Sequence, residues 1–157
     1  MSEKTIPLPE HDPMTDEGKL ITGTWSQFLN KVLQDLLSAP KVIASLVFTA
    51  QTAAISATAL ATPANPGLYR VSYNTHVTTA AGVSSSVTVT VAWTQSGSAV
   101  SDSSAALTAN ATNVARTGSL LLQLDGGTAV NVSTSYASNA AGAMAYELYV
   151  TLEKVQI

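Results

Sequence analysis

The stretch VTVTVAWT, residues 87–94, decides the fold class of this chain. Its large apolar side chains occupy every second position, and threonine or alanine fills the positions between them. Successive side chains of a β-strand point to opposite faces, so this period of two predicts a strand with one buried and one solvated face. Strands of that kind belong to antiparallel sheets, which makes the chain a mainly β protein.

The same alternation recurs along the rest of the chain, at 69–77, 130–136 and 144–152. Clusters of glycine, proline, serine and asparagine separate these segments, as at 63–67, 80–82, 96–98, 125–127 and 139–142. Further strands are expected at 45–50, 54–61 and 105–112. The total of about eight predicts an antiparallel jelly-roll sandwich over residues 43–157.

Residues 1–42 have a different character. Three prolines and mixed charges predict an extended arm over 1–23, and residues 39–42 form a linker after Pro40 ends the helix that follows the arm. Between them, a helical period over 24–38 gives a broad apolar stripe, made of Trp25, Phe28, Leu29, Val32, Leu33, Leu36 and Leu37. A helix of about four turns is marginal alone in water. The stripe is therefore expected to pack on its own domain or on partners, and both possibilities stay open.

Composition excludes several classes of function. The net charge is -3 and lysine and arginine form no cluster, which argues against nucleic acid as a partner. The most apolar stretch, 42–61, is interrupted by polar residues, which argues against a membrane span. The N-terminus is acidic and broken by prolines, unlike a secretory signal, so a product made in the cytoplasm is expected.

The sandwich segment offers few groups for chemistry. Its charged residues after Val42 are only seven: Arg70, Arg116, Lys154, Asp102, Asp125, Glu147 and Glu153. The two histidines of the chain, His11 and His76, have no neighbouring cluster of ligands, and Asp125 lies in a glycine turn without the further acids of a calcium loop. No nucleophile elbow or phosphate-binding loop occurs. We therefore expect no enzyme activity, no metal and no cofactor.

Aromatic side chains are the largest groups in this small-residue body. Most of them are expected in the core. The last strand carries Tyr146 and Tyr149, which form a possible trimer interface, or for Tyr149 a surface that contacts glycans.

The order of these patterns resembles the C1q/TNF-like jelly roll. The stretch PGLYRVSY, residues 66–73, is similar to that family's proline-glycine entry into an aromatic-rich strand. The stretch SLLLQLDGGTAVNV, residues 119–132, is similar to its late hairpin, and 143–155 ends the domain as that family's last strand does. The resemblance covers about 43–157 and implies a compact homotrimer with its termini near one end.

The first forty residues resemble the anchoring leader of tailed-phage virion proteins, in which a proline- and acid-spaced arm precedes a Trp-x-x-Phe-Leu helix. Here Pro9, Asp12 and Gly18 precede Trp25, Phe28 and Leu29. The two resemblances together imply a non-enzymatic phage virion protein: a homotrimeric fibre, head decoration or tail-associated appendage, attached to other virion proteins through residues 1–38. The alternatives are a receptor- or glycan-binding tip protein of a phage fibre, and an extracellular C1q-like binding module.

Overall fold

The computed structural model describes residues 23–37, 40–81, 84–138 and 143–155, and within the helix it describes side chains up to Gln34. The chain divides into two compact units, Met1–Ala39 and Pro40–Ile157. In the first unit, α1 spans Gly23–Leu37, one residue earlier at each end than the sequence predicts. The arm predicted over 1–23 lies almost wholly outside the described residues.

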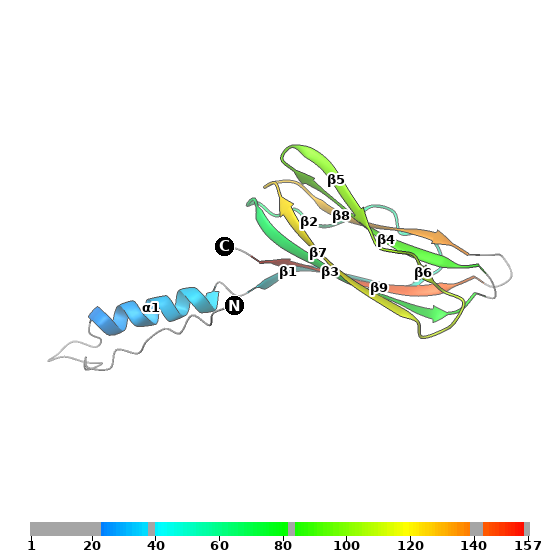
Figure 1. Ribbon diagram of the computed structural model, residues 1–157, viewed down its shortest axis with the longest axis horizontal. Helices are drawn as coiled ribbons and strands as arrows, with labels where there is room; N and C mark the ends of the chain where they lie inside the picture. Colours follow the sequence, from blue (N-terminus) through cyan, green and yellow to red (C-terminus); the bar gives the residue numbers. More distant parts are fainter. Residues whose placement is uncertain (1–22, 38–39, 82–83, 139–142, 156–157) are drawn as a thin grey trace. The chain divides into compact units, whose positions relative to one another are not determined.

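The second unit is a sandwich of two antiparallel sheets (Figure 1). Its strands follow in chain order: β1 Lys41–Gln51, β2 Thr58–Ala61, β3 Gly67–Thr79, β4 Ser86–Gln95, β5 Ser98–Ser103, β6 Leu107–Thr108, β7 Ala115–Leu124, β8 Val130–Ala137 and β9 Ala145–Lys154. One sheet has the order β1-β9-β3-β7, and the other has the order β2-β8-β4-β5 with β6 beside β4.

This connectivity is that of a jelly roll, which confirms the predicted fold class. The chain crosses from one sheet to the other at most of its connections, and its first and last strands are hydrogen-bonded neighbours. Lys41 pairs with Lys154, so the body begins and ends at the same end of the sandwich. The loops before β4, β7 and β9 lie at the opposite end, because His76 pairs with Ala115 and Thr79 with Ala145.

The core lies between the two sheets and is made mainly of valine and leucine. The alternation of the sequence correctly predicts the buried side chains at 69–77 and 87–94, among them Val71, Val77, Val89 and Val91. One polar group in the core joins the sheets: the Thr134 hydroxyl on β8 lies 2.6 Å from the Tyr146 hydroxyl on β9. Most buried polar groups in proteins have a hydrogen-bond partner in this way.

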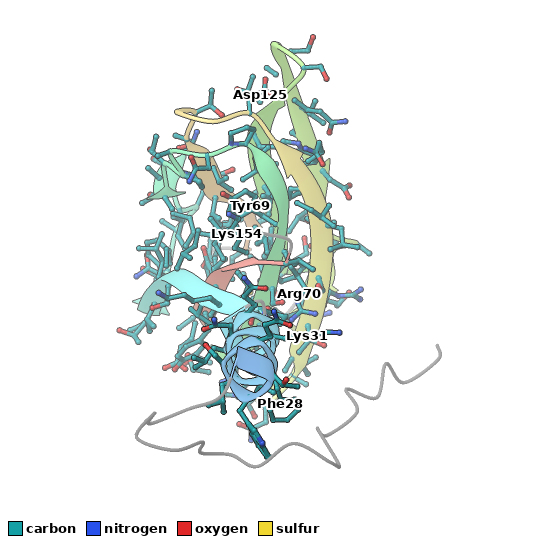
Figure 2. All side chains as sticks on the ribbon, turned by 90° about the vertical axis from the view of Figure 1, so that its left-hand side faces the viewer. Phe28, Lys31, Tyr69, Arg70, Asp125 and Lys154 are labelled. Atoms are coloured by element: carbon teal, nitrogen blue, oxygen red, sulfur yellow. The ribbon has the colours of Figure 1, made fainter. Side chains whose placement is uncertain are left out.

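The described turns confirm the glycine signals at 96–98 and 125–127, whereas Gly82 and the turn predicted at 139–142 lie outside the described residues. Ser96 and Gly97 both have positive φ, which is the conformation that a tight two-residue hairpin between β4 and β5 requires. The Asp125 carboxylate, in the loop after β7, accepts hydrogen bonds from the backbone N–H groups of Ser96 at 3.0 Å and Gly97 at 2.7 Å (Figure 2). Asp125 therefore fastens a hairpin of one sheet to a loop of the other.

Two expected strands differ from the structure. The segment 105–112 is mostly loop and pairs with β4 only at Leu107–Thr108. The strand β5 takes its place at the sheet edge, although its sequence SAVSDS contains one large apolar residue and gave no signal. The predicted strand at 54–61 is shortened to Thr58–Ala61, and β1 begins at Lys41, inside the segment expected to be a linker.

Candidate interaction face

The outer face of the sheet β1-β9-β3-β7, called here the four-strand face, carries the exposed large apolar side chains of the described body. Leu121 is 64% exposed, Val47 57%, Val42 54% and Tyr149 41%. Ile43 is also exposed and lies beside Val42 where β1 shifts register. Exposed apolar groups scattered singly are ordinary, but a set confined to one face marks an interaction site.

The register places these groups along rungs that cross the sheet. One rung crosses the sheet through four directly paired residues: Val42, Glu153, Arg70 and Leu121. Its two ends, Val42 and Leu121, are apolar. Another rung contains Val47, Tyr149, Asn74 and Thr117. The rung between them is built of hydroxyl residues alone: Ser45, Thr151, Ser72 and Ser119. Exposed apolar groups thus lie on the edge strands β1 and β7 and, at Tyr149, on β9. The rung of small hydroxyl residues separates the two rungs that carry them.

The charged groups on the four-strand face have partners within the face. Arg70 donates to Glu153 from Nε at 2.9 Å and also from Nη2. Glu147 accepts a hydrogen bond from the Tyr149 hydroxyl at 3.0 Å, and its Oε2 lies 3.9 Å from His76 Nδ1. This bond and the nearby negative charge raise the pKa of Tyr149, because the ionised phenol would face a carboxylate. Covering this face would therefore leave few charges without a partner.

The outer face of the other sheet, called the five-strand face, has a different chemistry. One of its rungs contains Ser103, Thr90 and Ser133. The next contains Ser101, Ala92, Asn131 and Ala59. Thr90 and Ser103 pair through their hydroxyls at 2.8 Å. Among the described residues this face exposes no large apolar side chain. The five-strand face is therefore suited to remain exposed to solvent.

In the helical unit, the structure bears on five of the seven predicted anchor residues. Trp25, Phe28 and Leu29 are half-buried, and Val32 and Leu33 are exposed. The rings of Trp25 and Phe28 meet edge to face, with centroids 5.6 Å apart. Figure 2 looks nearly along the helix axis and shows Phe28 and Lys31 projecting in different directions. Leu36 and Leu37 lie in the helix, but their side chains fall outside the described residues.

The two tyrosines predicted as a trimer interface lie in different environments. Tyr149 is 41% exposed on the four-strand face. Tyr146 is fully buried, stacks on Tyr136 with ring centroids 6.0 Å apart, and donates a hydrogen bond to the carbonyl of Ala53 at 3.0 Å. Burial raises the pKa of Tyr146. Its place in the interface is therefore wrong: the two residues are three apart on a strand, and an odd separation puts them on opposite faces.

The ionisable groups of the body do not gather into a reactive site within the described residues. Glu153, Glu147 and Asp125 are held by the contacts given above, and Asp102 on β5 accepts a hydrogen bond from the N–H of Ser103. The described chain has no group of three or more metal-ligating side chains. Within the same residues, no helix combines the length and apolar character needed to cross a membrane.

Sequence reasoning missed Val42, Val47 and Leu121 as surface residues. A signal for two of them was present, because Leu120-Leu121-Leu122 and Leu46-Val47-Phe48 are continuous apolar runs inside segments that otherwise alternate. Such a run places apolar groups on both faces of a strand. Comparison with the models of known protein families found no match, and comparison with curated proteins found no similar relative.

Proposed function

We propose that this chain is a non-enzymatic structural protein of a phage particle: its sandwich forms a homotrimer through the four-strand face, and its N-terminal segment attaches the trimer to other virion proteins. The observation that carries the proposal is the confinement of exposed large apolar groups to one face whose charges are already paired. That combination favours burial against protein over a role in binding a polar small molecule.

The positions of the apolar groups favour a ring of copies. Val42 and Leu121 end the same rung on opposite edge strands, three strand spacings or about 14 Å apart. Leu121 on β7 of one copy can meet the apolar groups on β1 and β9 of the next copy head to tail. Such contacts generate a closed ring when the rotation closes. The resemblance to C1q/TNF-like domains sets the number of copies at three.

Assignment to a virion rests on the leader-like sequence of residues 1–38. The neighbouring ends of the body at Lys41 and Lys154 support it, because an attachment segment at one end leaves the loops before β4, β7 and β9 at the other. In their described parts, at 80–81, 84–85, 109–114 and 143–144, those loops contain no charged or aromatic residue. A receptor- or glycan-binding tip needs such groups, so a structural role is favoured.

The attachment role is tested by replacing Trp25 and Phe28 together with alanine in the complete chain. Loss of two anchoring aromatics, about 3 kcal/mol for each, should abolish incorporation into particles while the thermal stability and mass of the free protein stay unchanged. Asn30→Ala on the same helix is the control and should incorporate normally. A sharp fall in the melting temperature of the body would instead show that the helix packs on its own domain.

A further inference from the structure

Two buried polar side-chain atoms have no hydrogen-bond partner among the described residues: Thr75 Oγ1 and Arg116 Nε. They belong to residues that face each other directly, on β3 and β7. Thr75 is only 2% exposed, and Arg116 is half-buried between the exposed Ala115 and Thr117, on the same side of β7 as Leu122 and Leu124. Both side chains therefore point from their strands toward the inside of the sandwich, where polar atoms ordinarily have hydrogen-bond partners.

Arg116 also has no counter-charge within the described part of the chain. A guanidinium group remains protonated in proteins, so its positive charge persists at this half-buried position. The acids of the body are engaged elsewhere, as given above, and no carboxylate is paired with Arg116. The other arginine, Arg70, shows the contrast, since it lies on the outer face and pairs with Glu153.

Large apolar groups border the Thr75–Arg116 pair, and a glycine beside Arg116 leaves room for an aromatic ring. On the next inward rung Tyr73 faces Gly118, where an added Cβ would lie 2.2 Å from the tyrosine ring. Only glycine lets the ring lie across β7 beside Arg116. On the other side, the N–H of Val77 donates to the carbonyl of Val114 at 2.9 Å, and both side chains border the core. Charge–dipole and hydrogen-bond interactions are strengthened in such a low-dielectric frame.

We propose that Thr75 and Arg116 form a binding site for an oxyanion, a carboxylate or phosphate group whose oxygens accept hydrogen bonds from Arg116 and from the Thr75 hydroxyl. A cation is repelled by the guanidinium. A water molecule would satisfy the two polar atoms but leave the charge uncompensated. The site lies on β7, which is an edge strand of its sheet. This site is on the inner side of β3 and β7, so it is independent of the four-strand face.

The test uses the complete chain and a titration with sodium phosphate or sodium acetate against sodium chloride at constant ionic strength. Melting temperature and the NMR signal of the Arg116 Nε–H are followed together. We expect a saturable rise in melting temperature and a saturable shift of that signal. Thr75→Val should raise the apparent dissociation constant about ten-fold by removing one hydrogen bond. Arg116→Gln should abolish the saturable rise, and Arg70→Gln, the matched control, should retain it.

The two arms distinguish the sources of the anion. Saturation by acetate as well as phosphate identifies a site that an acidic side chain of another protein could fill, whereas saturation by phosphate alone identifies a phosphate site. If neither anion shifts the Arg116 Nε–H signal of the unmodified chain, the proposal is wrong. It is equally wrong if Arg116→Gln folds and still gives the full saturable rise.

Discussion

The two outer faces of the same sandwich have opposite chemistry. The five-strand face is built from Ser, Thr, Ala and Asn, whereas the four-strand face exposes Val42, Val47, Leu121 and Tyr149. The strict alternation of β4 accounts for much of the first, and the apolar runs that break the alternation in β1 and β7 account for most of the second. An apolar run inside an alternating strand therefore indicates that the outer face of the strand also carries apolar side chains, and that a partner is needed to cover them.

The largest expected effect comes from placing a charge among the exposed apolar groups of β1. Val47→Asp should dissociate the trimer, because burying an unpaired carboxylate costs roughly 3–5 kcal/mol, and about 3 kcal/mol already weakens association more than 100-fold. Sedimentation equilibrium at micromolar concentration should then give one chain mass of 16.2 kDa instead of three.

The matched control is Thr90→Asp, which places the same charge on the five-strand face. It should leave the trimer mass unchanged. If Thr90→Asp dissociates the protein and Val47→Asp does not, the roles of the two faces are reversed.

A smaller effect separates the two tyrosines of β9. Tyr146→Phe removes a hydroxyl that bonds Thr134 and the Ala53 carbonyl inside one chain. Urea unfolding should show a loss of about 1–2 kcal/mol, because polar groups in the core lose their partner. Tyr149→Phe removes a hydroxyl at the surface and should cost the single chain less than about 0.5 kcal/mol. Equal losses in the two variants would contradict their placement on opposite faces.

The smallest effect is a pH dependence at alkaline values. The pKa of Tyr146 is raised by burial, and that of Tyr149 by its hydrogen bond to Glu147, so both phenols should ionise above the ordinary value of about 10. A raised pKa favours the neutral form in the folded chain. The stability that Tyr146 contributes in this way is present below about pH 10 and is lost as pH rises through its folded pKa.

Tyrosinate absorbance measured against pH checks this expectation, with the two phenylalanine variants assigning the signals. Glu147→Gln should return the pKa of Tyr149 toward its ordinary value and leave Tyr146 unchanged. If the pKa of Tyr149 is the same in the unmodified chain and in Glu147→Gln, the hydrogen bond between Tyr149 and Glu147 does not exist in solution.

The sequence predicted the fold wherever apolar side chains are large and regularly spaced. The buried rows of β3 and β4 follow directly from alternation, and the hairpin at Ser96-Gly97 follows from its glycine. The strand β5 could not be found, because its place at the edge depends on pairing with β4 and its own side chains are small. Neither could the Thr75–Arg116 pair, since register between distant strands brings these residues together.

The candidate face was predicted only at Tyr149. Its other exposed apolar members lie on β1 and β7, and their common surface exists only once the order β1-β9-β3-β7 is known. The helix α1 was predicted closely, because a period of 3.6 is a local property of one segment.

Hydroxyl-radical footprinting of the unmodified chain, read by mass spectrometry over a range of protein concentrations, tests most directly whether the four-strand face is buried between copies. In one chain Leu121 is 64% and Tyr149 41% exposed, so both should be labelled rapidly at high dilution. We predict that their labelling falls several-fold at concentrations where the trimer forms, while Val100 and Ala99 on β5 keep a constant rate. Undiminished labelling of Leu121 and Tyr149 in the assembled protein would contradict the central claim.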